Sequence, residues 1–153
     1  MSATTAPAVP RTLHRSPVQG RPLHPLHAIL LAFPLPLFLG ALLADVAYWR
    51  TYHVQWTNFA SWLIAGALFF GGFALLWALI SLIRSRPPRR RHAALYFMAL
   101  LATWVVGIFS ALVHGKDAFA VMPEALYLSA AVVLLALVAS WLGYAGARAE
   151  RVA

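Results

Sequence analysis

Six histidines and four acidic residues are the most reactive side chains in this cysteine-free chain of 153 residues. His27 and His92 lie at the starts of two apolar stretches, and His53 and His114 lie at the opposite ends. Two histidines on different helices at one depth can ligate the iron of haem b between apolar helices. His27 and His92 are the better candidate pair, and His24 could replace His27. The alternatives are boundary histidines among lipid headgroups, a metal site or a proton relay.

Asp45 is a carboxylate within an apolar stretch, 18 residues after His27. That separation is about five helical turns, so both side chains lie on one stripe. The same stripe contains Pro34, Phe38 and Ala41. A face with a carboxylate, a histidine and a proline kink should point into a bundle, away from lipid. We expect Asp45 to pair with a basic group at its end of the helix or to handle protons. The candidates there are Arg50, Lys116, His53 and His114.

The elements that must position these residues are four apolar stretches. Hydrophobic residues make up 62% of the chain and charged residues 10%, against about 45–50% and 25% in soluble domains. The stretches are long enough to cross a bilayer as helices, and they cover about residues 28–49, 59–83, 93–113 and 124–147. Small residues four positions apart, such as Gly107 with Ala111 and Ala139 with Gly143, favour close helix contacts. The predicted fold is all-α, an integral membrane four-helix bundle over residues 23–148.

The basic residues predict the orientation of the spans. Of the 12 Lys and Arg residues, only Arg50 and Lys116 lie in the loops after the first and third spans. The others precede the first span, separate the second from the third, or follow the fourth, which places both termini in the cytoplasm. Residues 1–22 are predicted to be a disordered basic tail and residues 149–153 a short tail. Because the basic residues flank apolar runs, we expect a lipid bilayer as partner and no nucleic acid.

The segment HPLHAILLAFPLPLFLGALLADVAYW, residues 24–49, resembles the opening motif of a bacterial membrane family catalogued as domain of unknown function 2231. The matching residues are His24, Pro25, Leu26, His27, Phe33, Pro34 and Asp45, and His92 is similar to the family's histidine before the third span. Ala28 and Ser81 depart from the pattern, where many members have Pro and a second Asp. The resemblance implies a multi-pass protein of the bacterial inner membrane. Related domains occur beside Rieske or cytochrome modules, which implies redox work.

Three functional hypotheses follow. The first is an accessory subunit of a redox or respiratory complex with a membrane protein partner. The alternative is an electron-transfer cytochrome with His27 and His92 as axial ligands, and a small transporter is a weaker alternative. The chain has no phosphate loop, nucleophile elbow or zinc-protease motif, so we do not expect an enzyme.

Overall fold

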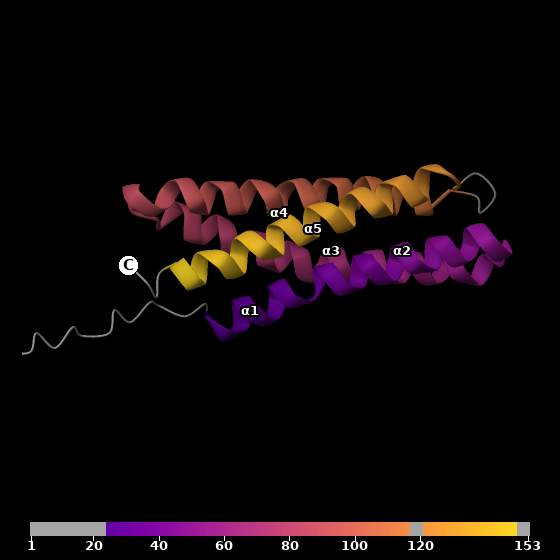
Figure 1. Cartoon of the computed structure of the whole chain (residues 1–153), viewed down its shortest axis with the longest axis horizontal. Coiled ribbons are helices and arrows are strands. Elements are labelled where there is room, and N and C mark those ends of the chain that lie inside the picture. The colour runs from indigo at the N-terminus through magenta and orange to yellow at the C-terminus, as the bar shows by residue number, and fades with distance from the viewer. Residues whose placement is uncertain (1–23, 117–120, 150–153) are drawn as a thin grey trace, which may run out of the picture.

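The computed structural model describes residues 24–116 and 121–149, and its regular elements are helices (Figure 1). They are α1 (Pro25–Ala32), α2 (Pro34–Thr51), α3 (Val54–Ile83), α4 (Pro87–His114) and α5 (Glu124–Ala149). Four segments are long and apolar enough to cross a membrane: Pro25–Thr51, Val54–Ile83, Arg89–His114 and Glu124–Gly146. The predicted all-α membrane bundle is therefore confirmed. The predicted tails, residues 1–22 and 149–153, lie outside the described residues, except that α5 ends at Ala149.

The first span is interrupted at Pro34, where the sequence predicts a proline kink. Phe33 separates α1 from α2, and Pro34 is the first residue of α2. Pro34 and Pro36 lack the N–H groups that would bond one turn back, so the hydrogen-bond ladder is broken there. The ladder resumes with the bond from the Leu37 amide to the Phe33 carbonyl, at 3.2 Å.

The helices form a ring in which α2, α3, α4 and α5 each pack against the next and α5 closes against α2. Helices α2 and α4 therefore lie diagonally opposite each other. The core has two clusters of buried side chains in which alanine is the commonest residue. A Cβ added to Gly107 would lie 2.9 Å from Leu68 and 3.0 Å from Phe38. The predicted small-residue contacts thus occur where helices approach closely.

The bundle has two distinct ends, which lie at opposite sides of Figure 1. The arginine end contains the start of α1, the α3–α4 turn at residues 84–86 and the end of α5. The distal end contains the α2–α3 turn at residues 52–53, the end of α4 and the start of α5. A buried histidine lies near each end, His27 on α1 and His114 on α4.

Candidate functional site

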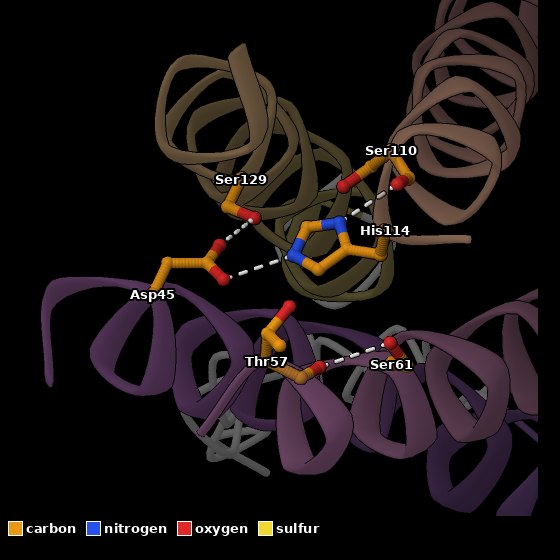
Figure 2. A network of polar contacts seen from close by, with 6 residues as sticks. All are labelled: Asp45, Thr57, Ser61, Ser110, His114 and Ser129. Carbon is orange, nitrogen blue, oxygen red and sulfur yellow. Dashed lines mark hydrogen bonds and ion pairs between the residues drawn. The ribbon is translucent and has the colours of Figure 1, made fainter. Parts of the chain in front are cut away.

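A buried carboxylate–histidine pair joins the diagonal helices at the distal end. Asp45 of α2 is 0% exposed, and its Oδ1 lies 2.9 Å from Nε2 of His114 on α4. Ser129 of α5 donates its hydroxyl proton to Oδ2 of Asp45 at 2.6 Å. Figure 2 shows the carboxylate between these two partners. The stripe predicted for Asp45 does face the interior, and of the candidate partners it is His114 that binds Asp45.

The hydrogen bond made by Nδ1, the other ring nitrogen of His114, limits the protonation states that the Asp45–His114 pair can have. Nδ1 of His114 lies 2.8 Å from the backbone carbonyl oxygen of Ser110. A carbonyl oxygen can only accept, so Nδ1 carries a hydrogen and donates it. The contact between Nε2 and Oδ1 then needs one further proton, on either the imidazole or the carboxyl group. The pair is therefore either an imidazolium with a carboxylate or a neutral imidazole with a carboxylic acid.

Two hydroxyl groups near the pair lack hydrogen-bond partners among the described residues, Thr57 Oγ1 and Ser110 Oγ. Thr57 lies on α3, and its hydroxyl points toward the His114 ring in Figure 2. The Thr57 carbonyl accepts a hydrogen bond from Ser61 at 2.9 Å, so the backbone around it is fixed. Buried hydroxyl groups are usually bonded to protein or water. These two are thus places where a water molecule or a ligand atom could bind.

A pocket of about 440 Å³ opens beside this network. It is lined by Val54, Gln55, Thr57, Asn58, Ser61, His114 and Lys116. All but two of these belong to the first turns of α3. His114 lines this pocket, but its side chain and that of Asp45 are 0% exposed, so the buried pair lies behind the pocket wall.

A second histidine network lies at the arginine end, again between the first span and α4. His27 is 3% exposed, and its Nε2 lies 3.0 Å from the hydroxyl of Tyr96 on α4. Trp77 of α3 stacks on the His27 ring at a centroid distance of 5.6 Å and contacts the His24 ring at 5.0 Å. His27 Nδ1 has no hydrogen-bond partner in the described part of the chain.

The other histidines of the sequence prediction lie apart from these networks. His92 is exposed, and its Nε2 lies 3.1 Å from the Leu142 carbonyl oxygen of α5. His53 is exposed in the α2–α3 turn. Nε2 of both His27 and His92 is thus engaged, and iron ligation through these atoms would first require breaking both hydrogen bonds. Within residues 24–116 and 121–149, no group of three His, Asp or Glu side chains is placed to hold a metal ion.

The sequence indicates Asp45 and its candidate partner His114 at the distal end and His27 at the arginine end, but not Tyr96, Ser129 or Thr57. Tyr96 and His114 are separated by 18 residues, as are His27 and Asp45. Two parallel helices with equal spacing can pair at both levels, so this repeat is a signal for the Tyr96–His27 and His114–Asp45 bonds. Ser129 and Thr57 have no comparable signal.

One comparison with known protein families gives a match that covers most of the chain. A family model described as "Predicted membrane protein (DUF2231)" matches residues 23–153. No curated protein and no solved structure matches the chain. The chain therefore belongs to the DUF2231 family of predicted membrane proteins, the family that the motif at residues 24–49 resembles.

Proposed function

From this membership and the geometry above, we propose that the protein handles protons at the distal end of its bundle, in a bacterial cytoplasmic membrane. The buried Asp45–His114 pair binds and releases a proton, and the pocket beside the pair is the side from which that proton arrives. The proton exchange serves a redox or respiratory complex to which the chain is an accessory subunit.

The observation that supports this proposal best is the hydrogen bonding of His114. Because the Ser110 carbonyl accepts from Nδ1, one proton must lie between Nε2 and Oδ1, on either the imidazole or the carboxyl group. Ionisable groups inside membrane spans are expensive, and they commonly mark proton or ion pathways. The described hydroxyls near the pair are those of Ser129, Thr57 and Ser110, and Lys116 lines the adjoining pocket.

Infrared spectroscopy of labelled aspartate tests proton exchange directly. The chain has two aspartates, Asp45 and Asp117, so the variant Asp117→Asn with ¹³C-aspartate carries the label at Asp45 alone. We expect its carboxyl band to change with pH between the carboxylate and carboxylic acid positions. His114→Gln should alter that titration, while His53→Gln, at an exposed histidine of the same end, should leave it unchanged. A carboxyl band that stays constant over the whole pH range in which the protein is folded would reject the proposal.

The partner is tested by purification in mild detergent. An accessory subunit should elute with a redox or respiratory membrane protein in a fixed ratio, identified by mass spectrometry. A single monodisperse species of this chain alone, extracted from cells that express the native partner genes, would argue against that part of the proposal.

The cytochrome remains a second candidate because His27 and His92 lie at the same end of the bundle and His27 Nδ1 is unbonded within the described residues. A haem would supply one-electron transfer between its two oxidation states. Purified protein from haem-supplemented cells should then show a Soret band that shifts on reduction with dithionite. Colourless protein would discard this candidate.

A small transporter is the weaker alternative. Residues 28–44 and 97–113, which lie between the two histidine networks, contain no ionisable side chain. Transporters usually place their substrate site near the midplane, often at broken helices. The break at Pro34 is the feature that favours this alternative.

A further inference from the structure

Arginines are concentrated around the α3–α4 turn, at the arginine end of the bundle (Figure 1). They are exposed, and we call them the arginine patch: Arg84, Arg86, Arg89, Arg90 and Arg91. The described residues contain two acidic side chains, Asp45 and Glu124, and both lie at the distal end. Within the described part of the chain, the arginine end therefore carries a strong positive charge.

The start of α4 contributes side chains, and not amide groups, to this patch. Helix α4 begins with Pro87 and Pro88, and proline has no amide hydrogen. The next two amides, of Arg89 and Arg90, both donate to the Arg86 carbonyl oxygen, at 3.0 and 3.1 Å. Binding by the arginine patch thus depends on the guanidinium groups.

Three of these arginines lie where a helix disfavours cations. The N-terminus of a helix carries a positive partial charge, so acidic residues are favourable there and basic residues are unfavourable. The first turn of α4 contains no acidic residue, and Arg89, Arg90 and Arg91 follow its two prolines. An anionic group bound to the patch would reduce both the repulsion among these cations and their repulsion from the helix end.

The neighbouring side chains place the patch at the level of lipid headgroups. Ile83, the last residue of the apolar span Val54–Ile83, is 75% exposed, and Arg84 follows it directly. Leu95 is 53% exposed and lies four residues after Arg91, so both belong to one face of α4. On both helices, a surface suited to acyl chains thus changes to arginine within about one turn. The anionic groups at this depth of a membrane are phospholipid headgroups.

We infer that the arginine patch binds anionic phospholipids, with its guanidinium groups on the headgroup phosphates and the acyl chains along the exposed apolar faces of α3 and α4. Guanidinium groups bind phosphate through paired hydrogen bonds. Because the patch has several cations, it should bind cardiolipin, which has two phosphates, more tightly than phosphatidylglycerol, which has one. This inference does not rest on proton exchange, since Asp45 and His114 lie at the distal end.

Titration of the full-length protein with cardiolipin in a neutral detergent, followed by native mass spectrometry, measures the binding. A basic residue near an anionic membrane surface contributes about fivefold to the binding constant. The double variant Arg90→Gln with Arg91→Gln should therefore weaken cardiolipin binding about 25-fold. Phosphatidylcholine has no net charge, so it should bind more weakly than cardiolipin and equally to both proteins.

Two matched double variants separate the charge of the patch from its position and from folding. Arg50→Gln with Lys116→Gln removes two exposed cations of the distal end and should change the affinity less than twofold. Arg90→Lys with Arg91→Lys keeps both charges and should retain most of the affinity. Equal losses in the glutamine and lysine variants of Arg90 and Arg91 would overturn the inference, because charge would then not be what binds the lipid.

Inorganic phosphate distinguishes a lipid site from a site for a soluble anion. It has the charge but no acyl chains, so at matched ionic strength it should not displace cardiolipin, and displacement would overturn the assignment to lipid. Cardiolipin that binds no more tightly than phosphatidylcholine would also overturn the inference, and an acidic protein surface would then be the partner that fits the charge. These outcomes hold whatever the infrared titration of Asp45 shows.

Discussion

At the residue scale, each end of the bundle has a histidine whose polar contacts cross between the first span and α4. At the distal end, His114 binds Asp45, and at the arginine end, His27 binds Tyr96. Within apolar surroundings each of these groups would be costly without its partner. The two hydrogen bonds therefore link the first span to α4, which lies diagonally opposite, at both ends of the bundle. We call the Asp45–His114 bond the distal tie and the His27–Tyr96 bond the tie at the arginine end. Of the two, the distal tie is the one that includes an acidic side chain.

A double-mutant cycle on Asp45→Asn and His114→Gln measures the distal tie. Each single variant removes one partner of a buried hydrogen bond, so the free energy of unfolding should fall by about 1–3 kcal/mol. The coupling energy between the two sites should be about 0.5–2 kcal/mol, as for contacting residues within membranes. The measurement is unfolding in mixed micelles of increasing dodecyl sulfate. Strictly additive effects would mean that the two side chains do not interact in the folded protein.

Tyr96→Phe tests the tie at the arginine end. It removes the hydroxyl bound to Nε2 of His27 and leaves both ring nitrogens unpartnered within the described structure. The expected loss is about 1 kcal/mol of unfolding free energy. Tyr127→Phe is the matched control because Tyr127 of α5 is 69% exposed, and it should change stability little. A Tyr96→Phe protein as stable as the Tyr127→Phe protein would show that the bond contributes nothing.

At the scale of the helices, the glycines of α5 set how closely α5 approaches its neighbours. A Cβ at Gly143 would lie 2.5 Å from Leu31 and 2.9 Å from the Tyr96 ring. Leu31 is 1% exposed and Tyr96 is 9% exposed, so either side chain would have to shift within the packed core. The position of α5 at this level therefore depends on glycine, and Tyr96 is also the residue that binds His27.

Gly143→Ala should destabilise the bundle by about 1–3 kcal/mol, because an extra methyl group overpacks a filled contact. Gly66→Ala on α3 is the control, since its Cβ would lie 3.5 Å from Leu37, an ordinary contact. The free energy of unfolding of Gly66→Ala should equal or slightly exceed that of the unmodified protein, because alanine favours a helix more than glycine does. Unfolding in mixed micelles compares the two. The packing argument fails if Gly143→Ala is the more stable variant.

Hydropathy and proline positions predict much of the fold, since span length and the break at Pro34 follow from local chemistry. The polar start of α3 was missed because the predicted span began at residue 59, whereas α3 begins at Val54. Residues 54–58 are too polar for an apolar window, yet they continue the helix beyond it. The pocket lies mostly on this overlooked turn, so the hydropathy pattern could not indicate it.

At the scale of the whole molecule, the site arises from how four helices are rotated against one another. The sequence predicts that the Asp45 stripe faces inward, but the choice of His114 over His53, Arg50 or Lys116 depends on the bundle geometry. A lone hydroxyl such as Ser129 within an apolar span has no periodic pattern of its own. Its contact with Asp45 joins α5 to the α2–α4 tie, which only the assembled bundle brings about.

The arginines at and just after the α3–α4 turn predict the orientation of the bundle, and cysteine labelling tests that prediction. The chain contains no cysteine, so each introduced thiol is unique. His53→Cys places a thiol at the distal end and Ser85→Cys places one at the arginine end. Because Arg-rich loops stay in the cytoplasm, a membrane-impermeant maleimide added to intact cells with a permeabilised outer membrane should label His53→Cys. It should label Ser85→Cys only after lysis.

A third variant controls for burial in lipid. Leu134 of α5 is 65% exposed on the bundle surface, at a position within the span Glu124–Gly146. Leu134→Cys should resist the polar reagent both in intact cells and after lysis, and should react once the protein is denatured. Labelling of Ser85→Cys in intact cells, with His53→Cys protected, would reverse the orientation. The pocket beside the Asp45–His114 pair would then face the cytoplasm, and the proton exchange that we propose would take place with that side.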